Sequence, residues 1–444
     1  MQYEKYRQWN LEKHTYKRRR KHKRQRSCKD QNRKTMSFDR TGSIRSYYSK
    51  LVQYLNNSDY IQSIHAKSVV YAPVHFSFKL RYDDTITFLK QIVSSYILYN
   101  GALVISFEKC KTSSIAAFAL LNVILKNLEE IRTKYNYCRY KKCCKGVKVI
   151  RSKVDVKTNK YLHAFLNIHL PPEQNDGSHF LKLPLQSGKQ RSYKENPKTK
   201  VSAAVVDFVN QSTAEAGAQL KMEGRRAIEH LMGEVLGNAE DHSAPNSYWY
   251  VDAISFAEKQ ENTEVVELNL AIINIGLSMY EGFEATKIMN ADNYSKCENL
   301  YKIHKDQFTL FNRFDRESLF TMYMLNDGIS RLKYADESRG NGTMRFLDAF
   351  ITIGSFGAIN KRFNCQLNVI SGHTVLTCDN DMHSYKINGL NMLSLNSQND
   401  FRRLPEKSHL TYNEEYFPGT ILECHIFLNK DYFENRINID NNVN

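Results

Sequence analysis

The stretch that decides the fold is residues 229–243, "EHLMGEVLGNAEDHS". Apolar residues recur there with the i, i+3, i+4, i+7 spacing of an amphipathic helix, at Ala227, Ile228, Leu231, Met232, Val235, Leu236 and Ala239. Glu234, Asn238 and His242 follow one another at intervals of four residues, and each interval turns by only about 40° on a helix of roughly 3.6 residues per turn. The spacing therefore predicts a helix with one buried face and one polar stripe, whose side chains can act on one ligand together.

Two glycines accompany the polar stripe. Gly233 and Gly237 each weaken a helix by roughly 1 kcal/mol relative to alanine. Their presence indicates that a ligand or another backbone approaches the helix closely. Taken alone, the pattern also fits an ordinary amphipathic helix with a polar edge.

Two glycine motifs follow downstream. In "ELNLAIINIGLSM", residues 267–279, a buried strand is predicted to run into Asn274, Ile275 and Gly276. In "SRGNGT", residues 338–343, two glycines precede the helical pattern "MRFLDAF". Glycines at a helix start allow backbone N–H groups to approach a phosphate, assisted by the helix dipole.

With these motifs in this order, residues 201–428 resemble the GHKL ATP-binding superfamily, which includes gyrase B, heat-shock chaperone ATPases, histidine kinases and anti-sigma serine kinases. The resemblance implies an α/β sandwich that binds ATP and magnesium. Glu234 would be the general base that activates water or a hydroxyl, and Asn238 would coordinate the magnesium ion. His242 stands where kinase-type members often have a histidine.

The glycine motifs supply the remaining residues that the resemblance implies. Asn274 and Gly276 match the first glycine box, with asparagine where the family usually has aspartate and Ser278 where it has a second glycine. The asparagine carbonyl would accept a hydrogen bond from the adenine amino group. The second glycine box, which closes over the phosphates, would comprise Arg339, Gly340, Gly342 and Thr343. Thr420, in "PGT", would support the adenine pocket, and residues 277–338 would form the ATP lid.

The N-terminal half shows a different alternation of helices and strands. Helical patterns over residues 85–100 and 113–131 alternate with strand patterns over 102–107 and 145–150, which predicts an α/β layer. "ALVISFEKCKTSSIAAFALLNVILKNL" resembles the core of a STAS domain, in which a serine at the start of a helix accepts phosphate from a GHKL kinase. Ser113 or Ser114 matches that serine, although the neighbouring positions hold Thr112 and Ile115 instead of aspartate and glycine. The alternative is that these serines only cap the helix.

Together these patterns predict an α/β protein with an N-terminal STAS-like α/β domain and a C-terminal GHKL-type α/β sandwich. The predicted organisation is a basic arm over residues 1–40, the STAS-like domain over 41–170, a linker over 171–200, the ATP-binding domain over 201–430 and a tail over 431–444.

The positive charge is concentrated in the arm. Of the net charge of +16, residues 1–34 contribute +11. Such a segment attracts nucleic acid or an anionic lipid surface, or it serves only as a solubilising tail.

Cysteines and hydropathy suggest where the protein resides. The nine cysteines are odd in number and scattered, which favours free thiols in a reducing compartment. Cys138, Cys143 and Cys144 cluster without the usual ligand pairs of a zinc site, so simple thiols and a metal site are both open. With no apolar run long enough for a membrane span and no apolar segment near the N-terminus, we expect a cytoplasmic protein without a transmembrane segment.

The sequence leaves three functions open. The first is a slow ATPase in which the lid closes on Mg-ATP, with a protein partner bound through the STAS-like domain. The second is a serine kinase switch that acts on its own or another STAS-like domain. The third is a non-catalytic ATP-binding adaptor that holds nucleic acid with its basic arm.

Overall fold

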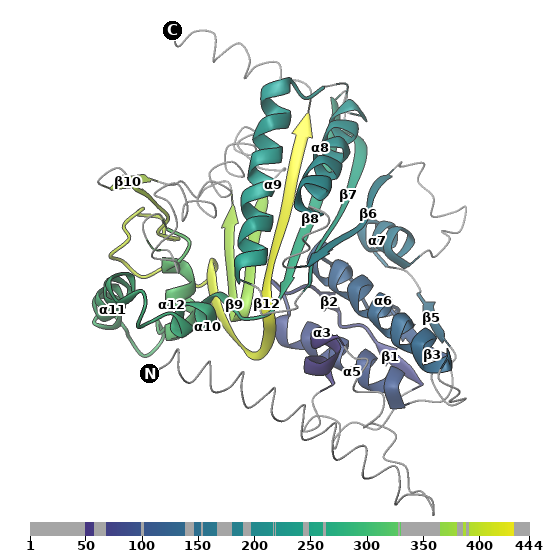
Figure 1. The fold of residues 1–444 in the computed structure, drawn as a ribbon, viewed down its shortest axis with the longest axis horizontal. Coiled ribbons are helices and arrows are strands. Elements are labelled where there is room, and N and C mark those ends of the chain that lie inside the picture. The colour runs from purple at the N-terminus through teal and green to yellow at the C-terminus, as the bar shows by residue number, and fades with distance from the viewer. Residues whose placement is uncertain are drawn as a thin grey trace, which may run out of the picture.

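The computed structural model describes residues 49–56, 68–98, 102–137, 146–151, 154–166, 180–189, 197–215, 217, 219–242, 248–260, 263–326, 329, 365–379, 385–387 and 390–429. In Figure 1 these residues form a small parallel sheet with its helices, placed beside a larger antiparallel sheet that carries helices of its own. The molecule is therefore of the mixed α/β class that the sequence predicts.

The N-terminal layer is built on three parallel strands in the order β1-β3-β5. The strands are β1 (Val69–Tyr71), β3 (Ala102–Ser106) and β5 (Gly146–Ile150). The helices are α3 (Lys50–Leu55), α5 (Tyr82–Leu98), α6 (Ile115–Tyr137) and α7 (Val156–Leu166), and a two-stranded parallel pair joins β2 (His75–Phe76) to β4 (Thr112–Ser113). Every residue from Ile115 to Leu121 is buried. A helical segment that is apolar on all sides must be covered on all sides, so the first two turns of α6 lie in the interior.

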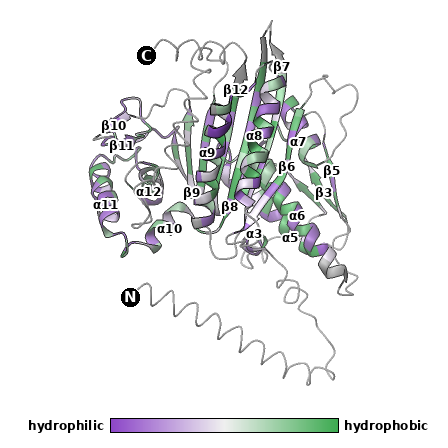
Figure 2. Ribbon diagram, turned by 45° about the horizontal axis from the view of Figure 1, so that its top comes forward, coloured by the Kyte–Doolittle hydropathy of each residue, from purple (hydrophilic) through white to green (hydrophobic). Residues whose placement is uncertain are grey.

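The larger sheet has five strands in the order β6-β7-β8-β12-β9, and all neighbours are antiparallel. Its strands are β6 (Phe180–Lys189), β7 (Tyr248–Gln260), β8 (Thr263–Ile275), β9 (Gln366–Asp379) and β12 (Leu410–Asn429). Two helices, α8 (Pro197–Glu215) and α9 (Met222–His242), lie side by side over this sheet in Figures 1 and 2. The long helix predicted around the polar stripe is α9.

Both faces of the five-stranded sheet are buried. Strand β8 shows this by its alternation: Leu268, Leu270 and Ile272 belong to the core shared with α8 and α9. The residues between and after them belong to the core of the N-terminal layer, namely Ala271, Ile273 and Ile275. The two predicted domains therefore share a hydrophobic core along one face of this sheet.

Polar contacts also join the two parts. Asn122 on α6 donates a hydrogen bond of 2.9 Å to the carboxylate of Asp252, which is fully buried on β7. Lys157 on α7 and His425 on β12 lie 2.6 and 2.8 Å from the Glu267 carboxylate. Burial alone would raise the pKa of Glu267, but the positive charge of His425 and Lys157 outweighs it and holds that pKa well below its usual range.

A helical insertion follows β8, within residues 277–338. It contains α10 (Met279–Ala285), α11 (Ala291–Lys305) and α12 (Arg316–Tyr323), and a small hairpin of β10 (Tyr385–Ile387) and β11 (Leu390–Met392) follows later in the chain. Ser278 starts α10 with a capping box, because its hydroxyl accepts from the Glu281 N–H while the Glu281 carboxylate accepts from the Ser278 N–H. Figure 2 shows α11 as largely hydrophilic, in contrast to the strands of the sheet.

The structure differs from the sequence prediction at the linker. Residues 180–189 lie in that predicted linker, yet they form β6, an edge strand of the described sheet. Pro184 sits in the register shift between Leu183 and Gln186, where proline, which lacks an N–H, is tolerated. Strand β9 is continuous over residues 366–379 and bends at Gly372, which has a φ of +60°.

Candidate functional site

A row of aligned residues crosses the sheet beneath the C-terminal half of α9. Trp249 on β7 pairs with Asn274 on β8, Asn274 pairs with Thr420 on β12, and Thr420 pairs with Ser371 on β9. Asn274 continues the alternation of Leu268, Leu270 and Ile272, so it lies on the face that α8 and α9 cover. The structure thus brings together Asn274 and Thr420, two residues that the sequence analysis selected from segments almost 150 positions apart.

Within this row, the side-chain oxygen of Asn274 differs from its neighbours in its hydrogen bonding. Its side chain is 6% exposed, and its buried Oδ1 has no hydrogen-bond partner among the described residues. A buried carbonyl oxygen without a donor carries a desolvation penalty of about 1–3 kcal/mol. A ligand that presents an N–H group at this point would remove that penalty.

The hydroxyl groups beside Asn274 are already paired. Ser371 Oγ lies 3.0 Å from Thr420 Oγ1 and accepts a bond of 2.8 Å from the N–H of Met279, the first residue of α10. This pair ties the last strand of the sheet to the start of the helical insertion. Gly276, selected from the first glycine motif, donates its N–H to the Pro418 carbonyl at 3.0 Å, so that N–H serves the contact between β8 and β12.

A glycine makes this close contact between strands possible. Gly419 has a φ of +137°, and a Cβ there would lie 1.9 Å from the carbonyl oxygen of Asn274. Both the backbone conformation and the available space therefore require glycine at this position. The glycine of the "PGT" motif thus sets how closely β12 approaches Asn274.

Helix α9 supplies the other side of the site. Met232, Val235, Leu236 and Ala239 are buried against the sheet, which leaves the predicted polar stripe at the edge of the contact. Near the end of α9, Glu240 accepts a hydrogen bond of 3.3 Å from the Trp249 indole N–H. Because Trp249 pairs directly with Asn274, the last turns of α9 lie at the same end of the sheet as the unpaired oxygen.

Within the stripe, Glu234 and Asn238 are both half-buried. Glu234 Oε1 lies 3.7 Å from Nε2 of His230, one turn earlier. A Cβ added at Gly233 or Gly237 would meet no described atom within 4 Å. Among the described residues, no neighbouring backbone lies close to these glycines, although the sequence suggested a ligand or another backbone there. With respect to the described atoms, space remains beside the polar stripe.

Several selected residues cannot be placed. Arg339, Gly340, Gly342 and Thr343 lie outside the described residues, as do the arm, the tail and the Cys138, Cys143 and Cys144 cluster. His242 ends α9, and its side chain is also outside the description. No group of three or more His, Cys, Asp or Glu side chains suited to a metal occurs in the described ranges.

The start of α6, where the phosphate-accepting serine was predicted, is occupied by a carboxylate. Glu423 on β12 is 3% exposed and accepts hydrogen bonds of 2.9 Å from the Ala116 N–H and from the Asn368 amide. Ser113 Oγ pairs with Thr158 Oγ1 at 2.7 Å, whereas the buried Oγ of Ser114 has no partner in the described part of the chain. The sequence analysis missed Glu423 because its contact joins residues 307 positions apart.

The cysteines and the helices agree with two further expectations. Cys110, Cys297, Cys365, Cys378 and Cys424 are free and buried, and burial raises the pKa of the Cys110 thiol to about 11. None of the described helices combines the length and the apolar character that crossing a bilayer requires.

Comparison with known proteins gave no match to a family model, to a curated protein or to a solved structure.

Proposed function

We propose that this chain binds Mg-ATP in the manner of the GHKL superfamily and hydrolyses it slowly, with closure of a lid over the nucleotide. The observation that carries the proposal is the unpaired, buried Oδ1 of Asn274 at the end of β8, beside the last turns of α9. The resemblance assigns an adenine-binding role to this same position. A donor such as the adenine amino group fits an acceptor that lacks any described partner.

Each residue of the candidate site would have its own role in binding or hydrolysis. Asn274 would accept a hydrogen bond from the adenine amino group. The hydrogen-bonded pair of Thr420 and Ser371 would support the adenine pocket. Asn238 would hold magnesium, which when bound supplies positive charge that offsets the charge on the phosphates. Glu234 would take a proton from the attacking water.

The first test is calorimetric titration of Mg-ATP into the full chain, with phosphate release followed in parallel. Wild type is expected to bind, and Asn238→Ala to lose most of the binding. Glu234→Gln is expected to keep binding but lower phosphate release by about 10²–10⁴-fold, because a general base contributes on this order. Glu229→Gln, a substitution of the same type at an exposed position of α9, serves as the matched control and should behave as wild type.

The outcomes distinguish the remaining functions. Absence of Mg-ATP binding by wild type contradicts the proposal. Binding without release of phosphate, unchanged in Glu234→Gln, assigns the chain to the class of ATP-binding adaptors. Phosphate transferred to a serine, lost in Glu234→Gln, assigns it to the class of kinase switches.

Contacts at the start of α6 favour hydrolysis over a switch that acts on this chain's own serines. The negative charge of Glu423 already occupies the N-terminal end of α6, where the helix dipole would otherwise favour a phosphate. A phosphate on Ser113 or Ser114 would introduce like charge beside this buried carboxylate.

A further inference from the structure

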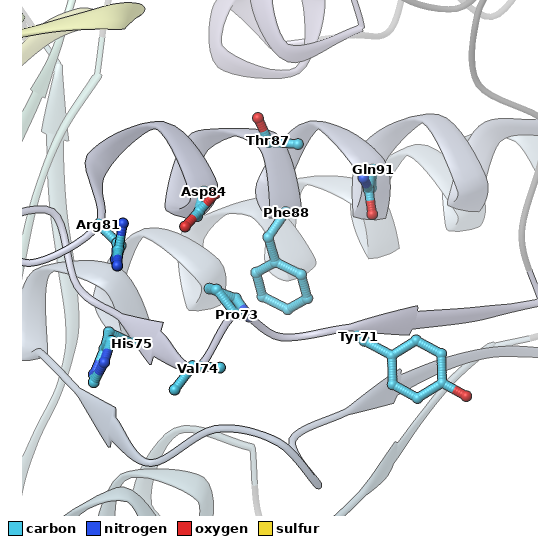
Figure 3. A pocket seen from close by; sticks show the side chains of 9 residues that line it. All are labelled: Tyr71, Pro73, Val74, His75, Arg81, Asp84, Thr87, Phe88 and Gln91. Carbon is cyan, nitrogen blue, oxygen red and sulfur yellow. The ribbon is translucent and has the colours of Figure 1, made fainter.

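A cavity of about 560 Å³ opens in the N-terminal layer, away from the row of Asn274. It lies between α5 and the chain segment that joins β1 to β2, and Figure 3 shows its lining side chains. Small-molecule sites typically have volumes of about 300–1,000 Å³ with apolar walls and a few polar groups. The size of the cavity therefore suits a metabolite of modest dimensions.

The walls combine an apolar centre with charged groups at one end. Phe88 and Pro73 lie in the middle of the view in Figure 3, Arg81 and His75 lie at one end, and Tyr71 lies at the other. Phe88 is 2% exposed, so its ring is a fixed part of the wall, whereas Tyr71 is 52% exposed. A ligand with an apolar body would lie between the two ends over Pro73 and Val74, with the small exposed part of Phe88 behind them.

The charged groups of the lining are not paired with one another. Arg81 directly precedes α5 and Asp84 lies in its first turn; both are exposed, and neither side chain has an ion pair or hydrogen bond with a described residue. His75 uses Nδ1 to contact Thr112 Oγ1 at 2.8 Å, which leaves Nε2 available. Charged side chains that line a cavity without protein partners are suited to bind a ligand of complementary charge.

We propose that this cavity binds a free α-amino acid with a large apolar side chain. The carboxylate would contact Arg81 and His75, the ammonium group would contact Asp84, and the side chain would lie over Pro73 and Val74. A ligand with only negative charge would meet the Asp84 carboxylate, and a ligand with only positive charge would meet the Arg81 guanidinium. A zwitterion matches both groups. Its binding involves no chemical reaction.

The proposal is tested by titrating L-phenylalanine and L-leucine into the full chain by calorimetry. Two analogues are titrated alongside: 3-phenylpropanoate, which lacks the ammonium group, and phenethylamine, which lacks the carboxylate. At least one amino acid is expected to bind with a dissociation constant of about 1 mM or tighter, a value within reach of a ligand of this size. Each analogue is expected to bind at least about tenfold more weakly, because it leaves one charged group of the cavity unpaired.

Variants of the lining identify the site. Arg81→Gln and Asp84→Asn are each expected to weaken amino-acid binding by about tenfold or more. Arg402→Gln, at an exposed position outside the cavity, should leave binding unchanged. Because Arg81 and Asp84 make no side-chain hydrogen bond or ion pair within the described residues, the midpoint of thermal unfolding of both variants without ligand should stay near that of wild type.

Three results would overturn the proposal. The first is the absence of binding heat and of any shift in the unfolding midpoint at amino-acid concentrations on the order of 10 mM. The second is equal binding of the amino acid and both analogues. The third is binding of phenylalanyl-alanine amide in the absence of any binding of the free amino acids, which would assign the cavity to the N-terminus of a peptide.

Discussion

The side chain of Asn274 places an acceptor oxygen in the interior at the expense of stability. An aspartate at 6% exposure would bury a full negative charge, whose desolvation costs far more than that of a neutral amide. Asparagine keeps the acceptor oxygen without the charge. Its Oδ1 nevertheless lacks a described partner, so the free protein carries the penalty of an unpaired polar atom.

Replacing this residue should therefore separate stability from binding. Asn274→Leu removes the unpaired oxygen at similar volume, and we expect the free energy of unfolding to rise by about 1 kcal/mol. The same variant should bind Mg-ATP at least about tenfold more weakly, because the acceptor for the base is lost. Chemical denaturation and calorimetry on the same preparations measure the two effects. A variant that is both less stable and equally able to bind would argue that the oxygen has a structural partner instead.

At the scale of elements, the cluster on β8, β12 and α7 connects two layers through one carboxylate. Glu267 lies within ion-pair distance of Lys157 and His425, and these cations hold its pKa well below the usual range. A carboxyl group with a lowered pKa in the folded state contributes stability at a pH above its unfolded value. That contribution is lost as the pH falls toward the folded value.

Glu267→Gln is thus expected to lower the stability of the protein most at neutral pH. As the pH falls below about 4.5, near the ordinary pKa of a glutamate, the difference in free energy of unfolding between wild type and variant should shrink. Urea denaturation at a series of pH values measures this difference. Glu414→Gln, which changes an exposed carboxylate outside the cluster, is the control. A difference that stays constant from pH 7 to about pH 3 would show that Glu267 contributes through packing alone.

Elements with a long periodic pattern could be predicted from the sequence, and elements defined by distant contacts could not. Helices α6 and α9 carry many apolar residues at helical spacing, so the local pattern is sufficient. Strand β6 reads "FLKLPLQSGK", in which Leu181, Leu183 and Leu185 alternate only over a short run that contains a proline. Its Gly188 leaves room for the Trp249 ring, a contact without a local sequence signal.

The candidate site shows the same limit. The motif residues on α9, β8 and β12 were predicted because their types and order carry the pattern. Neither the pairing of Thr420 with Ser371 nor the contact of Glu423 with α6 has a local sequence signal. The cavity was missed for the same reason, since it exists only once α5 lies beside the segment between β1 and β2.

At the scale of the whole molecule, the N-terminal layer covers one face of the five-stranded sheet. Residues of α5 and α6 share a core with β7, β8, β9 and β12, and α5 also binds the start of β12, where the Glu415 N–H donates to Asp83 at 2.8 Å. An interface of this kind is hydrophobic and continuous, unlike the polar contacts between domains that move independently.

Thermal or chemical unfolding should accordingly proceed in a single transition. Trp249 is one of only two tryptophans in the chain and is fully buried beneath α9, so its fluorescence reports on the C-terminal core. Far-ultraviolet circular dichroism reports on both halves. We expect the two signals to give the same midpoint, as in a cooperative two-state transition. Midpoints that differ, with fluorescence changing at a separate denaturant concentration, would indicate that the layers unfold independently.

The proline within β6 affects whether copies of this protein can associate through the edge of the sheet. An exposed edge strand offers unpaired backbone groups to any other chain, and long flat edges promote the growth of extended β-structure between molecules. Pro184 carries no N–H to donate, and the accompanying register shift interrupts the regular spacing that an incoming strand would need. The irregularity that hid this strand from sequence analysis therefore also protects the described sheet from aggregation along that edge.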